Sequence, residues 1–156
     1  MATAPDGKSP GYYERVEEVL KKYPNGKDSL AIPTWFYGQE PCNMFGTRIA
    51  KNFSNAIREE TLLSTATCGV VFTPGSAGTT EEVFMTAAQN HYGSFGFYCP
   101  MLFLGKKRYA EETNIYGLLK DLAKGREYEN FMAISDDPDE LAEFIRLHPP
   151  RKAPQQ

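Results

Sequence analysis

Short apolar runs alternate with amphipathic stretches along this chain, and the alternation constrains its fold more than any other feature. The runs are Leu30–Trp35, Gly69–Thr73, Met101–Leu104 and Asn130–Ile134. Continuous apolar runs of this length, bounded by turn residues, are typical of strands buried on both faces of a parallel sheet. Because helical patterns separate the runs, we predict an α/β fold in which right-handed crossovers connect parallel strands.

The stretches between the runs carry the signals for helices. Charges cover one face of Tyr12–Lys22, and a Pro-Asn-Gly turn follows it. From Met44 an apolar stripe repeats every four residues, which predicts a helix that buries Phe45, Ile49, Phe53 and Ile57. Thr79–Tyr92 and Ile115–Ala123 are further predicted helices. Together these patterns predict a three-layer, Rossmann-like parallel sheet of about four strands with helices on both faces.

For two of the predicted helices, the pattern also predicts which residues are buried or cap the helix. In the helix from Thr79, we expect the inward side chains to be Val83, Phe84, Ala87 and Ala88. The last helix has Asp137 as its predicted N-cap, with Pro138 at the first helical position and Glu140 at the third. Its buried stripe is predicted to be Leu141, Phe144 and Ile145.

The composition excludes several classes of protein. The chain has 156 residues, of which 41% are hydrophobic, so it can bury a core and is not a disordered chain. A net charge of −3 argues against binding to nucleic acid through its phosphates. No apolar run approaches the roughly 20 residues of a membrane span, and residues 1–11 show no secretory leader. We therefore expect a cytoplasmic protein without nucleic-acid or membrane partners.

We predict a single domain over residues 12–147, with a flexible lead-in at 1–11 and a disordered, proline-containing tail at 148–156. The three cysteines, Cys42, Cys68 and Cys99, are widely spaced. This spacing fits neither a disulfide framework nor a metal clip, so we expect reduced thiols that are mostly buried. The sequence predicts no metal site and no cofactor.

The segment with the most chemical information is Pro74–Thr79, a turn of small residues between a predicted strand and a predicted helix. Small residues let the backbone approach a ligand closely, and the first N–H groups of the following helix favour an anion. Ligands of open α/β sheets bind at the carboxyl ends of the strands, where this turn lies. The spacing fits an ordinary strand–helix turn equally well, with Thr79 or Thr80 as the N-cap.

The motif Pro74–Glu82 resembles the P-G-G-x-G-T-x-x-E motif of the LOG ("lonely guy") family of nucleoside-monophosphate phosphoribohydrolases. Family members carry an arginine on the preceding helix, and Arg58 matches its spacing. The resemblance covers roughly Leu30–Leu147 and implies that Arg58 and Glu82 are catalytic. It implies that phosphate is bound by Gly75, Ser76, Ala77, Gly78 and Thr79. It also implies a homodimer that releases the base from a monophosphate such as AMP.

The chain departs from the family pattern in two ways. Ser76 replaces the second motif glycine, although a serine still offers its backbone N–H if the backbone angles suit a side chain. Nothing before Leu30 resembles the family's own Gly-rich N-terminal half. The chain therefore resembles the second half of such an enzyme, as a gene fragment, a split subunit or a reduced relative. The alternative function is a non-catalytic nucleotide- or phosphate-binding module.

The proposed roles agree with the chemistry of N-glycosidic hydrolysis, in which positive charge develops on the sugar. A carboxylate such as Glu82 could stabilise that charge or activate water, and Arg58 could pair with the 5′-phosphate. From the pattern alone, a solvated arginine and dipole-favoured acids explain both residues as well. Weaker candidates are His91 as a base, Asp136 and Asp137 as metal ligands, and the aromatic residues Trp35, Phe36 and Tyr37 as a stacking surface for a base. Capping or core packing explains these more simply.

Overall fold

A computed structural model describes residues 10–35 and 43–154, and the chain divides into two compact units, Met1–Leu62 and Leu63–Gln156. This division differs from the single domain expected over residues 12–147. Most of the expected lead-in, together with Phe36, Tyr37 and Cys42, lies outside the described residues. The described chain is a mixture of helices and small parallel sheets, which agrees with the predicted α/β class.

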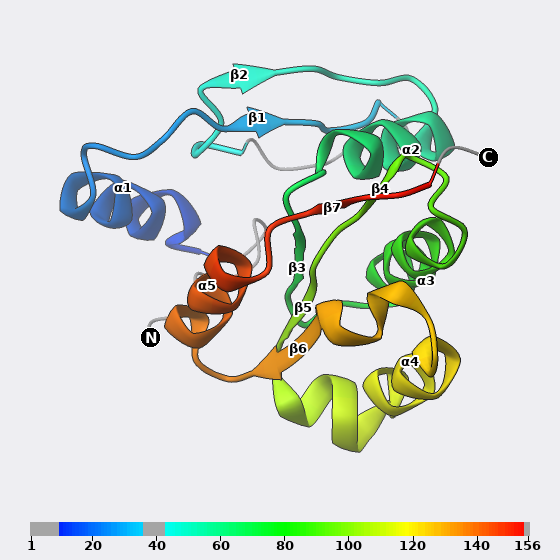
Figure 1. Ribbon diagram of the computed structural model, residues 1–156. Helices are drawn as coiled ribbons and strands as arrows, with labels where there is room; N and C mark the ends of the chain where they lie inside the picture. The colour runs from blue at the N-terminus through cyan, green and yellow to red at the C-terminus, as the bar shows by residue number, and fades with distance from the viewer. Residues whose placement is uncertain (1–9, 36–42, 155–156) are drawn as a thin grey trace. The chain divides into compact units, whose positions relative to one another are not determined.

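The first unit contains helix α1, Tyr12–Lys22, as the sequence predicts. Strands β1, Leu30–Ala31, and β2, Arg48–Ile49, then pair in parallel (Figure 1). An isolated parallel bridge between Thr34 and Asn52 continues the pairing. Helix α2, Asn55–Thr65, begins in this unit and ends beyond the unit boundary.

The helix predicted from Met44 is wrong in its first half, where the chain forms β2 instead. The N–H groups of Arg48 and Ala50 donate to the carbonyls of Ser29 and Ala31, across to the β1 segment rather than back along a helix. The predicted stripe is also not buried: the exposed fractions are 41% for Phe45, 67% for Ile49, 84% for Phe53 and 58% for Ile57. A four-residue repeat therefore does not mark a helix here, because extended partners take the backbone hydrogen bonds.

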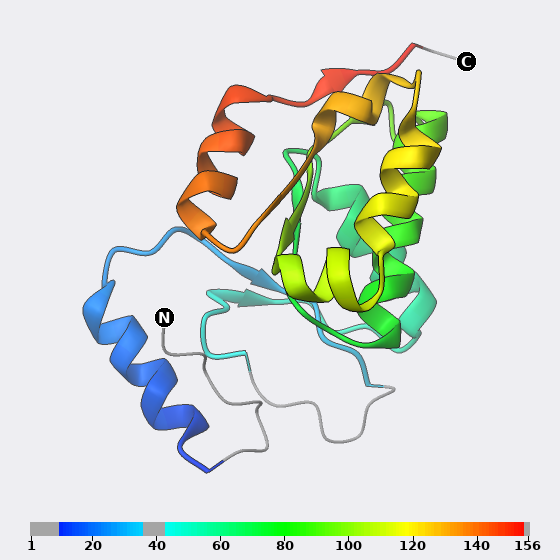
Figure 2. The ribbon, with the colours of Figure 1, turned by 90° about the horizontal axis from the view of Figure 1, so that it is seen from below.

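The second unit is built on a three-stranded parallel sheet in the order β3-β5-β6 (Figure 2). Its sheet strands are β3, Val70–Phe72, β5, Met101–Leu104, and β6, Met132–Ser135. Its helices are α3, Ala77–Tyr92, the π-helix η1, Lys107–Glu112, α4, Ile115–Ala123, the 3₁₀ helix η2, Glu127–Phe131, and α5, Pro138–Leu147. The π-helix and the 3₁₀ helix were not predicted, and η2 occupies the start of the strand expected from Asn130.

The tail is ordered where the sequence predicts disorder. Arg151–Lys152 forms strand β7, which pairs antiparallel with β4, Phe97–Tyr98. The N–H of Ala153 donates to the carbonyl of Gly96, and Ala153 is buried. A Cβ atom at Gly93 would lie 2.8 Å from the Ala153 Cβ, so the tail packs closely on the turn after α3.

The core of the second unit lies between the sheet and helices α3 and α4. Its central members are fully buried, and they include Val83, Met101, Phe103 and Leu119. On α3, Val83 and Ala87 face inward as predicted, but Phe84 and Ala88 are exposed, which corrects the expected set. On α5, Asp137 caps the helix through the N–H of Asp139, and Pro138 is its first residue, as predicted.

Candidate functional site

Pro74–Thr79 follows β3, but α3 begins at Ala77, two residues before the expected start at Thr79, so the last three residues of the predicted turn are already helical. The N-cap residue of α3 is therefore Ser76, neither Thr79 nor Thr80. Ser76 has φ −106° and ψ −146°, so its backbone is not in the left-handed region of positive φ that would favour a glycine. The Ser76 carbonyl accepts the N–H and the hydroxyl of Thr80, each at 3.1 Å, while the Ser76 side chain makes no capping hydrogen bond within the described structure.

Gly75 is the glycine that this turn requires. A Cβ atom there would collide with Oγ1 of Thr79 and would lie 2.7 Å from the Thr79 Cβ. Gly78, in contrast, has open space around it and an ordinary helical backbone. The motif's glycines Gly75 and Gly78 are both present in this chain. Close packing against Thr79 explains why residue 75 is a glycine, and the structure shows no such reason at residue 78.

The start of α3 offers backbone donors at the end of the sheet. The N–H groups of Ala77, Gly78 and Thr79 lie in the first turn of α3, where no carbonyl of the helix is placed to accept them. Ala77 and Gly78 are exposed, and Thr79 is half-buried. Uncapped N–H groups at the positive end of a 16-residue helix are suited to binding an anion.

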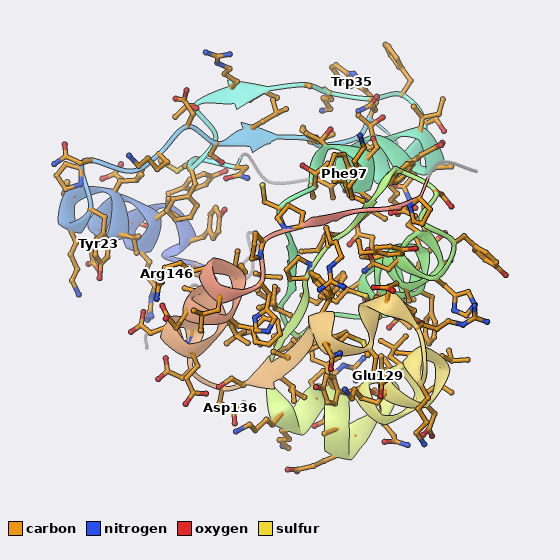
Figure 3. The ribbon with its side chains drawn as sticks, in the orientation of Figure 1. Tyr23, Trp35, Phe97, Glu129, Asp136 and Arg146 are labelled. Atoms are coloured by element: carbon orange, nitrogen blue, oxygen red, sulfur yellow. The ribbon has the colours of Figure 1, made fainter. Side chains whose placement is uncertain are left out.

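Hydrogen bonds tie the carboxyl ends of the sheet strands to one another. The Tyr109 hydroxyl donates to the Thr73 carbonyl at 2.5 Å, and burial raises the pKa of Tyr109, against a smaller opposing effect of Arg108. The Lys106 N–H donates at 2.8 Å to Oδ1 of Asp136, which follows β6 (Figure 3). Gly105, with φ +122°, approaches Pro74 so closely that a Cβ would lie 3.0 Å from Pro74 Cγ.

Sequence reasoning missed Tyr109, Gly105 and Lys106. A signal for them was present, because the carboxyl ends of parallel strands meet at one edge of a sheet, and these residues follow the β5 run. Asp136, considered as a metal ligand, instead accepts a backbone N–H, and Asp137 caps α5. Among residues 10–35 and 43–154, no cluster of three His, Cys, Asp or Glu side chains could hold a metal ion.

Arg58 and Asn55, both on α2, contact the buried carboxylate of Glu59. Nη2 of Arg58 lies 3.3 Å from Oε1 of Glu59, and Nε of Arg58 donates to Oδ1 of Asn55 at 3.0 Å. The Asn55 amide also donates to Oε1 of Glu59 at 2.7 Å, and Glu59 is only 2% exposed. Part of the role of Arg58 is therefore to compensate the charge of Glu59.

Glu82 is half-buried and lies on α3 about one turn after Gly78. Its carbonyl accepts the Thr86 hydroxyl at 2.8 Å. Because Arg58 belongs to the first unit and Glu82 to the second, their joint action stays a prediction.

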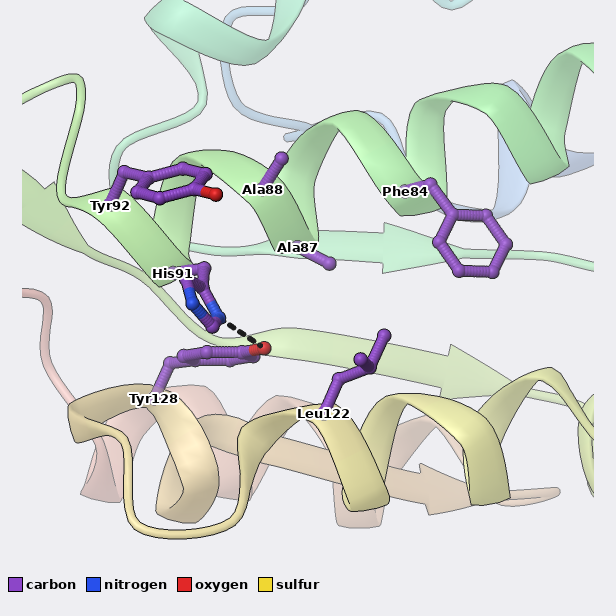
Figure 4. Close-up of a pocket in the computed structure, with 7 residues that line it drawn as sticks. All are labelled: Phe84, Ala87, Ala88, His91, Tyr92, Leu122 and Tyr128. Carbon is purple, nitrogen blue, oxygen red and sulfur yellow. Dashed lines mark hydrogen bonds between the residues drawn. The ribbon is translucent and has the colours of Figure 1, made fainter.

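His91 lies in a different part of the second unit from the turn. It lines an open groove of about 240 Å³ whose walls are Phe84, Ala87, Ala88, His91, Tyr92, Leu122 and Tyr128 (Figure 4). Its Nδ1 is 3.5 Å from the Tyr128 hydroxyl. At 1.5 Å per helical residue, His91 is roughly 18 Å along α3 from Thr79, so it does not serve chemistry at the turn.

Trp35 is exposed rather than part of a core. The residue is 58% exposed (Figure 3). Its ring stacks on Phe53 with the two ring centroids 6.1 Å apart, and Nζ of Lys51 lies 3.8 Å from the Trp35 ring centroid. Nδ1 of His148 lies 2.9 Å from the Phe144 carbonyl oxygen at the end of α5, so its role there is structural.

No helix in the described part of the chain combines the length and the apolar character that crossing a bilayer requires. A comparison with models of protein families finds none that matches the chain, and a search of curated proteins finds no match either.

Proposed function

We propose that the Pro74–Thr79 turn binds the 5′-phosphate of a nucleoside monophosphate such as AMP, and that the protein is a LOG-like phosphoribohydrolase. The observation that carries the proposal is the uncapped start of α3, reached through a turn in which Gly75 packs directly on Thr79. Helix N-termini at the carboxyl edge of parallel strands are common sites for phosphate.

The proposal includes a Rossmann-like arrangement of the second unit. The core cluster joins residues of α3 and α4 to alternate residues of β3 and β5, while α5 contacts β5 and β6. Those contacts support helices on both faces of the sheet. They would orient the carboxyl ends of the strands toward a single ligand, as the tie between Lys106 and Asp136 also favours.

In the proposed reaction, water attacks the anomeric carbon of the ribose, the N-glycosidic bond breaks, and the base leaves with a proton. Glu82 would stabilise the positive charge on the sugar or accept the proton of the attacking water. Arg58 would contribute a guanidinium to the phosphate or to the carboxylate. Because Arg58 also compensates Glu59, its removal has a structural cost that the assay must separate from a catalytic one.

The test measures release of free base from AMP by the full chain. Glu82→Gln should lower the rate by at least about 100-fold if the carboxylate acts in the transition state. Glu81→Gln is the matched control, because Glu81 is the adjacent, exposed carboxylate on the same helix and should retain activity. For Arg58, the conservative Arg58→Lys keeps a charge beside Glu59 and is compared with Arg58→Ala at equal thermal stability.

The second candidate function is a nucleotide-binding module without catalysis. It is favoured if AMP shifts the backbone amide signals of Ala77, Gly78 and Thr79 while no base is released. If AMP neither binds nor is cleaved, both functions are wrong.

We also propose a cytoplasmic homodimer. β3 is a terminal strand of its sheet, and Val71 on it is 46% exposed, which favours association. Light scattering that gives a monomer across micromolar concentrations would contradict the dimer.

A further inference from the structure

Cys68 and Cys99 lie at matching positions before two neighbouring parallel strands. In the β3–β5 register Val70 faces Met101, and continuing that register back by two residues places Cys68 beside Cys99. The Val70 N–H donates to the Pro100 carbonyl at 2.8 Å, which is the hydrogen bond of the Val70–Met101 pair and brings the chain before β5 against the start of β3. A Cβ at Gly69 would also lie 3.4 Å from the Pro100 Cβ.

Each cysteine precedes its strand by two residues, and the residues two and four positions after each cysteine belong to the core cluster or pack against it. Phe72 and Phe103, which face one another in the register, join the core cluster with their rings 5.3 Å apart. Gly69, between Cys68 and β3, has φ +146°, so the side-chain alternation of the strand does not extend to Cys68, which lies in the turn before β3. The pKa of Cys99 is raised mainly by burial, is lowered by its hydrogen bond to Asn90, and is raised further by the charge of Cys68.

The two thiols differ in what surrounds them. The backbone of Cys99 is clamped by Asn90, which is 1% exposed: Oδ1 accepts the Cys99 N–H and Nδ2 donates to its carbonyl, each at 2.9 Å. Cys68 is exposed, in the turn between α2 and β3. One thiol is therefore held in place, and the other is open to a reagent in solvent.

We propose that Cys68 and Cys99 are a redox modification site that closes as a reversible disulfide when a small-molecule disulfide, of the type of oxidised glutathione, is present. Neighbouring strands lie about 4.8 Å apart, within the range of about 4.4–6.8 Å between Cα atoms that a disulfide needs. This inference is independent of the proposed phosphoribohydrolase activity.

The reaction proceeds by two exchanges. The Cys68 thiolate attacks one sulfur of the glutathione disulfide, forming a mixed disulfide and releasing one glutathione thiolate. The Cys99 thiolate then attacks the Cys68 sulfur and releases the second glutathione thiolate, and the two protons of the cysteines pass to the departing thiolates. The protein thiols lose two electrons, and one oxidised glutathione is reduced to two thiols. The bond would link the starts of β3 and β5. It would thereby close a loop of the chain, residues 68–99, that contains the candidate site.

The experiment exposes the folded full chain to mixtures of oxidised and reduced glutathione and measures intact mass, followed by mapping of linked peptides. It uses the Cys42→Ser chain so that the third thiol cannot react. We expect loss of two hydrogen masses, no bound glutathione, and a peptide that links Cys68 to Cys99. Cys99→Ala in the same background should instead keep a glutathione adduct on Cys68.

The matched controls separate proximity from simple reactivity. In urea the closed form should be replaced by glutathione adducts, because unfolding separates the two thiols. The proposal is overturned if the folded Cys42→Ser chain retains a glutathione adduct on Cys68, keeps both thiols reduced while free glutathione is oxidised, or forms only disulfides between chains. Cys99→Ser provides a second variant in case the alanine substitution unfolds the chain.

Discussion

The two units of this chain bury their apolar residues very differently. In the second unit, Met101, Leu102 and Phe103 on β5 are fully buried, and Met101 and Phe103 belong to the core cluster. In the first unit, Ile49 and Phe53 remain 67% and 84% exposed, although their spacing is as regular. The difference teaches that periodicity sets which residues share a row, whereas burial requires a facing layer of side chains.

The first unit buries few apolar residues beside its polar ones. Thr34 and Glu59 are among its buried residues, at 0% and 2% exposure, and its strands are two residues long. Segments with few buried apolar contacts open at lower free energy than a packed core. Single substitutions in the two units test this difference.

Phe103→Ala should lower the free energy of unfolding by about 3–5 kcal/mol, because it removes a large side chain from the packed core. Phe53→Ala, the same substitution at an exposed ring, should change it by no more than about 0.5 kcal/mol. Urea denaturation followed by circular dichroism measures both. Equal losses for the two variants would contradict the contrast between the units.

Asn90→Ala should cost about 2–3 kcal/mol, because it leaves the Cys99 N–H and carbonyl without their partner in a partly buried setting. Thr47→Ala in the first unit removes hydrogen bonds to Ser29 that are exposed, so water replaces them and the loss should stay below about 0.5 kcal/mol. The same denaturation curves give the comparison. A larger loss for Thr47→Ala would show that the first unit depends on this polar contact.

Tyr109→Phe should cost about 1 kcal/mol, since it removes the hydroxyl that donates to the Thr73 carbonyl. Burial raises the pKa of Tyr109, so its contribution is fully present below the unfolded pKa of about 10 and is lost as pH rises toward the folded pKa. Stability measured between pH 9 and 11, a range centred roughly on that pKa, should therefore fall less steeply in the variant than in the parent chain. An unchanged slope would show that ionisation of Tyr109 does not contribute to the pH dependence of stability.

Glu143→Gln should have the smallest effect. The Arg146 hydrogen bond lowers the pKa of Glu143, so its contribution is present above the ordinary carboxyl pKa and is lost as pH falls through the lowered value. Both side chains are exposed, as are Glu17 and Lys21 on α1 in the first unit. Neither Glu143→Gln nor Glu17→Gln should measurably change the melting temperature in high salt, where the surface pairs are screened.

β3, β5, α4 and the Asp137-Pro138 start of α5 could be predicted because local signals and tertiary packing agree there. The order of strand, turn and helix around Pro74 could also be predicted, although α3 begins at Ala77 rather than at the expected Thr79. The close contact of Gly75 with Thr79 is a packing detail that the spacing does not record.

The remaining features depend on contacts that a local pattern does not record. β2 exists because its N–H groups find carbonyls of the β1 segment, and β7 exists because it meets β4 from the other end of the unit. The tie from Tyr109 to Thr73 spans residues 36 positions apart, so no local spacing could indicate it. The catalytic assignment of Arg58 and Glu82 rests on resemblance and stays a prediction.

The pairing of β4 with β7 has a consequence for how the protein is made. During synthesis β4 leaves the ribosome before η1, α4, η2, β6 and α5, whereas its partner emerges only after all of them. The parallel strands β3 and β5 can meet much earlier, once α3 has been completed. A nascent chain stalled before Arg151 would therefore present the β4 edge to chaperones, and release of the last segment would cover it.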